Sequence, residues 1–327
     1  MKIRIPHNRP TFGKEEKLAC RRVMKSGWVG QGKEVEMFEN ELCEYIGLPK
    51  GHAVMVSSGT AALFLAIKHI GLKIVHYPTY SCSSVRYAIK MAGCRCLPLE
   101  VTDPYQDVYC HLFGMVNDVM TYPLKRDMPI IEDCAQAIGA RMKGKMVGTF
   151  GDYGIFSFSA TKMITSGGQG GAIVSKDWNR IEEIRDYRNF DMRKDEKSRF
   201  NFTITDLQAA IGRAQLSKLN NFIERREEIF QKYVRAGFGM VQNIGRDLED
   251  VRYRAVLKTG KQREIIKGLE DRGIRAIVPI EDFEIPNVHR FPLAQRMTKD
   301  FISLPCYPTL TDKEVDLIIS EVRKWIY

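Results

Sequence analysis

The sequence lacks the cysteine spacings that mark a metal site or a disulfide framework. Its eight cysteines contain no C-x-x-C pair and no paired cysteine and histidine spacing, and several of them lie in apolar stretches. Cysteines in such surroundings are usually buried free thiols. We therefore expect neither a structural zinc ion nor a disulfide framework.

The chain also lacks an apolar run that is long enough to span a bilayer. Its first residues, Met1 to Pro6, do not contain the apolar core of a secretory signal peptide. We therefore expect a cytoplasmic protein with no membrane partner.

No nucleic-acid-binding signature accompanies the formal net charge of +10. The basic residues are dispersed among acidic ones, and no arginine-rich run is interleaved with aromatic residues. A positive field equally favours anionic small molecules such as phosphates. The charge alone does not choose between these partners, and the missing motifs argue against nucleic acid.

Strand-like and helix-like segments alternate along the chain, which is typical of an α/β fold with a mostly parallel sheet. The pattern changes in the last third, so we expect a large domain over residues 1–225 and a smaller α/β domain over residues 226–327. We expect an irregular loop at residues 189–202 and a turn at residues 304–308. Helices are expected at residues 14–26, 33–46, 61–67, 83–92, 177–188, 205–211, 218–235, 261–272 and 311–326. Strands are expected at residues 54–56, 74–77, 94–101, 109–113, 129–133, 172–175, 251–258 and 274–280.

The most informative stretch runs from Ser157 to Gly171 and holds Lys162 among small polar residues, with a glycine cluster after it. A lysine that forms a Schiff base needs a partly desolvated amine and small neighbours that admit a flat cofactor. Most lysines are solvated surface residues, so this stretch alone favours a surface lysine. The motifs described next reverse that preference.

A short apolar strand, Val54 to Val56, leads through two serines to Gly59, Thr60 and a helical run. A strand, a small polar turn and a helix form the geometry that binds phosphate, because free N–H groups and the positive helix end face the anion. Taken alone, the pattern fits a simple helix cap by serine or threonine better.

Another apolar strand ends in Glu132 and Asp133. Open α/β sheets place ligand chemistry at the carboxyl ends of their strands. The main rival is a carboxylate that binds magnesium in a P-loop NTPase, and residues 139–145 have P-loop spacing. However, Met146 replaces the required serine or threonine, and this stretch follows the acidic strand, so we reject that interpretation.

Pyridoxal 5'-phosphate (PLP) requires these three features together. Lys162 would hold the cofactor as a Schiff base, and Asp133 would keep its ring nitrogen protonated. The helix start at Gly59 and Thr60 would bind its phosphate. Each motif is weak alone, but the three in this order indicate a PLP enzyme.

The chain resembles the DegT/DnrJ/EryC1/StrS family of PLP-dependent sugar aminotransferases. The family has the fold-type I architecture, with a large domain around a mostly parallel sheet and a smaller C-terminal α/β domain. The similarity runs almost from end to end. Its most specific blocks are Glu132-Asp133-Cys134-Ala135-Gln136-Ala137 and Phe156-Ser157-Phe158-Ser159-Ala160-Thr161-Lys162, with further matches at residues 30–32, 58–63, 168–171 and 303–305.

The resemblance implies roles for residues at matching positions. Lys162 would be the Schiff-base lysine and would carry the proton between the substrate's α carbon and the cofactor. Asp133 would pair with the pyridine nitrogen, and Gln136 would reach the phenolic oxygen of the ring. Ala135 would lie against one face of the ring.

The same resemblance implies how the phosphate would be bound. Gly59, Thr60 and Ser157 would bind it within one subunit. Asn201 would reach it from the neighbouring subunit, because family members are homodimers whose sites lie at the interface.

The sequence departs from the family pattern in two places. Where the family often has an aromatic residue that stacks on the ring, this chain has Cys82, so Tyr80 or a neighbour is expected to compensate. The chain is also short between Val101 and His111 and near its C-terminus, which affects the substrate pocket rather than the chemistry. Lys162 is retained where related dehydratases have histidine, and this favours transamination.

We therefore predict a PLP-dependent aminotransferase that transfers an amino group from glutamate to a nucleotide-linked keto sugar, both substrates being implied by the resemblance. The loop from Trp28 to Gln31 and the segment around Tyr307 are the expected sugar contacts. Two alternatives stay open: a PLP enzyme that acts on a non-nucleotide substrate, such as an aminocyclitol precursor, and a non-catalytic regulatory or binding protein on the same fold.

Overall fold

The computed structural model describes residues 3–118, 128–245 and 247–326. Most of the expected elements are present in it within a few residues of their expected ends. The helices are α1 (Lys14–Ser26), α2 (Lys33–Ile46), α3 (Gly59–Ile70), α4 (Ser83–Met91), α5 (Trp178–Arg188), α6 (Asp206–Leu216), α7 (Leu219–Arg235), α8 (Gln262–Glu270), α9 (Pro292–Asp300) and α10 (Asp312–Ile326). The strands are β1 (Ala53–Val56), β2 (Ile74–Pro78), β3 (Arg95–Leu99), β4 (Val108–Cys110), β5 (Ile131–Asp133), β6 (Arg141–Met142), β7 (Lys145–Met146), β8 (Tyr153–Ser157), β9 (Gly171–Val174), β10 (Leu248–Glu249), β11 (Ala255–Lys258) and β12 (Phe301–Leu304).

The central sheet has the strand order β1-β9-β8-β5-β4. Strands β8, β5 and β4 pair in parallel, whereas β9 pairs antiparallel with both β1 and β8. All strands of this sheet except β9 therefore run in one direction. A parallel pair, β2 and β3, lies next to β4. The Asp107 amide, directly before β4, donates to the carbonyl oxygen of His76 in β2. The predicted α/β fold with a mostly parallel sheet is confirmed.

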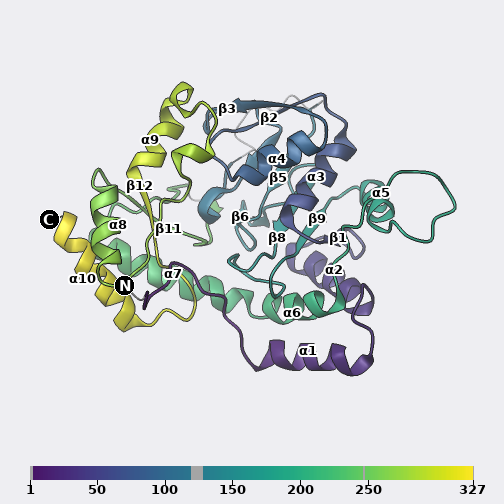
Figure 1. The fold of residues 1–327 in the computed structure, drawn as a ribbon, viewed down its shortest axis with the longest axis horizontal. Helices are drawn as coiled ribbons and strands as arrows, with labels where there is room; N and C mark the ends of the chain where they lie inside the picture. The colour runs from purple at the N-terminus through teal and green to yellow at the C-terminus, as the bar shows by residue number, and fades with distance from the viewer. Residues whose placement is uncertain (1–2, 119–127, 246, 327) are drawn as a thin grey trace.

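Helices cover both faces of this sheet (Figure 1). In β1, Ala53 and Met55 face a core shared with α2, α6 and the start of α7, while Val54 and Val56 face a core shared with α3, α4 and α5. This alternation is the period of two that a strand imposes on its side chains. Because both faces are buried, the strands are apolar throughout, and polar chemistry is confined to their ends.

The C-terminal elements form a separate core from Ile229 onwards, built on the antiparallel pair of β11 and β12 and covered by α8 and α10. Ile5 joins this core and bridges Ile274, so both ends of the chain lie in the same part of the molecule (Figure 1). The division into domains at residues 225 and 226 falls inside α7 and stays a prediction.

Several expectations about individual elements are wrong, most of them in the C-terminal part. The expected strand at residues 274–280 makes only isolated bridges at Ile274 and Ile277. The segment before the expected turn at residues 304–308 forms β12, and α9 was not expected. The strand expected at 251–258 begins only at Ala255, and the strand expected at 109–113 ends at Cys110, before a single 3-10 turn. Among the described residues, no helix is both long and apolar enough to cross a membrane.

Candidate active site

A cavity of about 200 Å³ lies at the ends of the central strands and at the start of α3. Of the nine residues that the sequence suggested for the site, eight line this cavity and one, Asn201, does not. The eight come from five separate stretches of the chain: Gly59, Thr60, Cys82, Asp133, Ala135, Gln136, Ser157 and Lys162.

The start of α3 forms one wall of the cavity. Ser58 caps the helix, because its side chain accepts from the Ala61 amide at 3.1 Å. In the described part of the chain, the amides of Gly59 and Thr60 have no hydrogen-bond partner. A Cβ at Gly59 would lie 2.8 Å from the Cβ of Ser157, so only glycine permits this approach of α3 to β8. Two free donors at the positive end of a helix, with Ser157 opposite, suit a phosphate group.

Asp133 ends β5 and faces the same cavity. Its Oδ1 accepts from the Ala135 amide at 3.0 Å, and its Oδ2 has only the thiol of Cys110 nearby, at 3.8 Å. Burial raises the pKa of Asp133, although the Ala135 amide and the charge of Lys162 act in the opposite direction. A carboxylate with little solvation and one oxygen bonded only by a thiol is complementary to a protonated ring nitrogen. The site therefore fits the pyridine ring of PLP, and this conclusion comes from the geometry of Asp133 and does not depend on the sequence motif.

Gln136 is held so that its amide group points at the cavity with a donor free. Its Oε1 accepts from the Phe113 amide at 2.8 Å, which leaves the NH₂ group available. An NH₂ donor at this position can reach an oxygen substituent on a ring held by Asp133. Ala135, between them in sequence, presents only a methyl group to the cavity.

Lys162 lies in a turn five residues beyond β8 and is partly buried. Its Nζ lies 5.1 Å from the centre of the Tyr253 ring. The turn is fixed by the Lys162 amide, which donates to the Ser159 carbonyl at 3.1 Å, and by Asn8, whose side chain donates to the Thr161 carbonyl at 2.6 Å. Lys162 is therefore a positioned amine that lines a cavity, and not the solvated loop lysine that its own stretch suggested.

Sequence reasoning missed Tyr253. The side chain is buried and belongs to the segment that leads into β11, about ninety residues from Lys162. Burial alone would raise its pKa, but the nearby charges of Lys162 and Arg254 outweigh that effect and lower it. A lone tyrosine in an irregular segment carries no pattern from which this contact could have been predicted.

His111 was also missed as a wall of the cavity, where it lies over Glu132. The His111 Nε2 is 3.3 Å from Glu132, and the Nδ1 accepts from the Asn117 amide at 2.9 Å. The Glu132 carboxylate also accepts from the amides of residues 148, 150 and 151. Both ring nitrogens and both carboxylate oxygens are thus engaged, so His111, Glu132 and Cys134 do not form a metal site although they cluster.

Cys82 lines the cavity as expected, at the start of α4, and its side chain is exposed. The expectation was that Tyr80 or a neighbour compensates for the missing aromatic residue, and Tyr80 itself does not line the cavity. Tyr80 is completely buried and packs edge-to-face on Phe113, with ring centroids 6.2 Å apart, in an apolar cluster with residues of β11 and β12. His111 and Leu112 line the cavity, and compensation by a residue other than Tyr80 stays a prediction.

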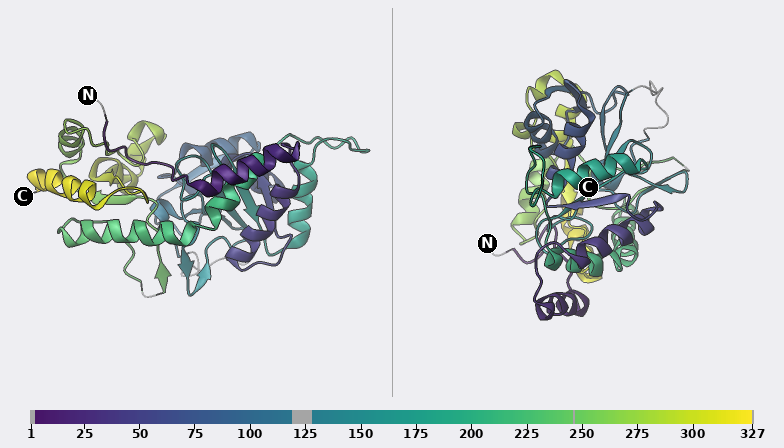
Figure 2. Two further views of the ribbon diagram at one scale, coloured as in Figure 1. Left: turned by 90° about the horizontal axis from the view of Figure 1, so that it is seen from below. Right: turned by 90° about the vertical axis from the view of Figure 1, so that its right-hand side faces the viewer.

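Asn201 lies outside the cavity, near the end of the exposed segment that follows α5. Its side chain accepts from the amide and hydroxyl groups of Thr203. The segment projects from the rest of the molecule (Figure 2) and carries the exposed side chains of Phe190, Met192 and Phe200. The role of Asn201 towards a neighbouring subunit stays a prediction.

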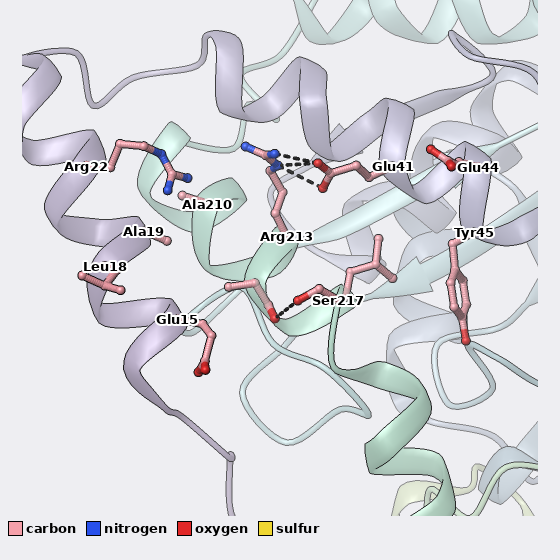
Figure 3. Close-up of a pocket in the computed structure, with 12 residues that line it drawn as sticks. Glu15, Leu18, Ala19, Arg22, Glu41, Glu44, Tyr45, Ala210, Arg213 and Ser217 are labelled. Carbon is pink, nitrogen blue, oxygen red and sulfur yellow. Dashed lines mark hydrogen bonds and ion pairs between the residues drawn. The ribbon is translucent and has the colours of Figure 1, made fainter.

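A second hollow, of about 660 Å³, lies between α1, α2 and α6 (Figure 3). Both of its arginines are already paired: Arg213 with Glu41 inside the hollow, and Arg22 with Glu34 of α2, which lies outside it. Its remaining walls are mostly aliphatic, such as Leu18 and Ala210. Nothing in this hollow matches the chemistry of the smaller cavity. The larger volume therefore does not mark the active site.

The model of the DegT/DnrJ/EryC1/StrS aminotransferase family matches residues 10–108 and 108–323. The chain belongs to this family. It is 27% identical to GDP-perosamine synthase of Escherichia coli O157:H7, with 98% of each chain covered. It is 28% identical to the dTDP-3-amino-3,4,6-trideoxy-alpha-D-glucose transaminase of Micromonospora megalomicea, with 94% of each covered.

The fold agrees with that assignment. The crystal structure of the aminotransferase TlmJ from Streptoalloteichus hindustanus superposes with a TM-score of 0.91 at 25% identity, covering 99% of this chain and 98% of that one. The predicted family, the fold-type I architecture and the assignment as an aminotransferase are therefore confirmed.

Proposed function

We propose that this aminotransferase uses PLP in the cavity between α3, β5 and Lys162. The proposal is carried by one observation: the weakly hydrogen-bonded carboxylate of Asp133, the free amides at the start of α3 and the amine of Lys162 face the same space. When bound, PLP would withdraw electrons from the α carbon of an attached amino acid. Asp133 would hold its ring nitrogen, while Gly59, Thr60 and Ser157 would hold its phosphate.

The remaining tasks fall to side chains of this chain. Lys162 would anchor the cofactor and would then use its Nζ to carry the proton between the donor's α carbon and the cofactor. Gln136 would donate to the ring oxygen, and Ala135 would lie flat against one ring face. Cys82 would contact the ring from the start of α4, over a smaller area than an aromatic side chain.

The proposed substrates are glutamate and a nucleotide-linked keto sugar. Support comes from the relatives, which are named for GDP-linked and dTDP-linked amino sugars, and from the net charge of +10, which suits an anionic diphosphate. Donor and acceptor would react in turn, so that one 2-oxoglutarate is released for each amino sugar formed.

We further propose that the enzyme is a cytoplasmic homodimer in which Asn201 of one subunit reaches the phosphate in the other. The exposed segment at residues 189–202 supports this arrangement, because Met192 and Phe200 are 93% and 61% exposed. Large apolar side chains on a projecting segment are typical of a protein interface.

A substrate panel tests the proposal. The enzyme is incubated with glutamate and, in turn, a GDP-linked keto sugar, a dTDP-linked keto sugar and a keto cyclitol without a nucleotide, and the amino product and 2-oxoglutarate are measured by mass spectrometry. We expect equal amounts of both products with a nucleotide-linked acceptor. Turnover of the keto cyclitol alone would favour the aminocyclitol alternative, and no turnover of any acceptor, with no change on adding glutamate, would favour the non-catalytic alternative.

A further inference from the structure

The thiol of Cys110 donates to the carboxylate that the proposed function assigns to the cofactor ring. Cys110 ends β4 and is the register partner of Asp133 in the parallel pair of β4 and β5, so both side chains point to the same side of the sheet. The Cys110 Sγ lies 3.8 Å from the Oδ2 of Asp133, and both residues line the cavity. Among the described residues, neither this thiol nor this oxygen has another hydrogen-bond partner.

The ends of the two strands hold this contact in place. The His111 amide, directly after Cys110, donates to the Asp133 carbonyl oxygen at 3.1 Å and continues the pairing of β4 with β5. The other carboxylate oxygen of Asp133, Oδ1, accepts from the Ala135 amide at 3.0 Å. Each carboxylate oxygen thus has one donor from the protein and keeps acceptor capacity for a group in the cavity.

Few groups act on the charge of Asp133. Burial raises the pKa of its carboxyl group, whereas the Ala135 amide, the interactions with Lys162 and His111, and the Cys110 thiol lower it. Burial also raises the pKa of the Cys110 thiol well above its usual range, and the carboxylate of Asp133 adds to that effect. Cys110 therefore stays protonated at neutral pH and keeps its proton available as a donor.

We propose that Cys110 is a positioning residue whose thiol holds the Asp133 carboxylate ionised and turned into the cavity. A hydrogen bond to a carboxylate favours its charged form. With its proton affinity lowered in this way, Asp133 would leave on the ring nitrogen of the cofactor the proton that the two groups share. A protonated ring is the form that withdraws electrons. This inference rests on the proposed function, since the ring nitrogen belongs to the cofactor proposed there.

A packing role for Cys110 is the alternative that the test must separate. Cys110 is 6% exposed and lies in the apolar core that the central sheet shares with α3 and α4. Cys110→Val fills this space without a donor, and Cys110→Ser keeps a donor. Cys134→Ala is the matched control, because Cys134 is a buried thiol next to Asp133 in the chain that does not line the cavity.

Infrared titration of the protein without cofactor tests the contact itself. Spectra of the wild type and the three variants are recorded from neutral to acidic pH, and the band that Asp133→Asn removes identifies the protonated Asp133 carboxyl group. We expect Cys110→Val to lower the acid dissociation constant of Asp133 about 3- to 10-fold, the effect of losing one hydrogen bond to its charged form. Cys110→Ser should lower it less, and Cys134→Ala should leave it unchanged. Melting temperatures verify that each variant is folded.

The protein loaded with PLP tests the consequence for the cofactor. PLP with an isotopically labelled ring nitrogen is added to the same proteins, and the NMR shift of that nitrogen reports how far the proton remains on the ring. We expect Cys110→Val to move this shift towards that of the unprotonated ring. Cys110→Ser should move it less, and Cys134→Ala should match the wild type.

Equal acid dissociation constants of Asp133 in folded Cys110→Val and wild type would overturn the proposal. Equal effects of Cys110→Val and Cys110→Ser would overturn it too, because packing and not the donor would then be responsible. An unchanged nitrogen shift in Cys110→Val would refute the role of Cys110 towards the ring. A protein whose Asp133 responds to Cys110→Val as expected but that binds no PLP would instead leave the contact standing and sink the proposed function.

Discussion

Glu132 and Asp133 are consecutive in the chain, yet their carboxylates face different sides of β5 and have pKa values shifted in opposite directions. Burial would raise the pKa of Glu132, but hydrogen bonds from His111 and from the amides of residues 151 and 148 lower it. Asp133 lacks comparable donors, so burial dominates and raises its pKa. Strand β5 thus places Glu132, an acid with a structural role, next to Asp133, an acid whose carboxylate is available to a ligand.

We expect Asp133→Asn to stabilise the protein without cofactor while abolishing aminotransfer. Because the pKa of Asp133 is raised on folding, its ionisation destabilises the native state as pH rises from about 3.8 through the folded value. Asp133→Asn removes this destabilisation. Its free energy of unfolding should therefore exceed that of the wild type by about 1 kcal/mol at pH 7 and should equal it below pH 3.8. Chemical unfolding at both pH values measures the difference.

Glu132→Gln is the matched control for that experiment and should behave in the opposite way. The pKa of Glu132 is lowered on folding, so its contribution is present above its ordinary pKa and is lost as pH falls through the folded value. At pH 7 the free energy of unfolding of Glu132→Gln should be about 3 kcal/mol below that of the wild type, because the substitution breaks a buried charged network. If Asp133→Asn were destabilised as much as Glu132→Gln, Asp133 would be a structural acid too.

An aromatic side chain at Cys82 should strengthen cofactor binding. Cys82 lines the cavity with an exposed thiol, and an aromatic ring stacked on the cofactor contributes about 0.5–1.5 kcal/mol beyond the area it buries. Cys82→Phe should therefore lower the dissociation constant of PLP by about 2- to 10-fold, as measured by fluorescence titration. Cys82→Ala should change it less than about 2-fold, and equal affinities for both variants would show that Cys82 does not face the ring.

The exposed segment after α5 should mediate dimerisation. Light scattering should give twice the chain mass of 37.5 kDa for the wild type. Met192→Asp combined with Phe200→Asp should give monomers with weakened PLP binding, because Asn201 would no longer reach the second site. Ile244→Asp is the control, since Ile244 is 95% exposed elsewhere. A wild-type monomer that binds PLP tightly would refute this interface.

Local signals explain which helices were predictable. The helices α1 and α2 have their predicted bounds because Gly27 and Gly47, with φ of +76° and +79°, end them in the left-handed conformation that glycine adopts easily. Thr205 caps α6 through its hydroxyl group, with Gln208 completing a capping box. Such signals lie within a few residues of the element that they define.

The elements and site residues that the sequence did not predict depend on contacts between distant segments. The strand β12 exists because it pairs with β11, more than forty residues earlier, and the apolar run at residues 274–280 finds only isolated bridges. In the site, the motif residues were predictable because their spacing is local. Tyr253 and Arg254 approach Lys162 only through the packing of the C-terminal part, and no local pattern marks them.

The visible spectrum of the purified protein tests the central claim most directly. PLP is added to the wild type, to Lys162→Ala and to Lys176→Ala, an exposed lysine that serves as the control, and each spectrum is recorded before and after glutamate. We predict a yellow band in the wild type and in Lys176→Ala that glutamate bleaches, and no such lysine-dependent band in Lys162→Ala. A wild type that stays colourless with PLP, or a Lys162→Ala variant that bleaches like the wild type, would contradict the assignment of Lys162 as the reactive amine.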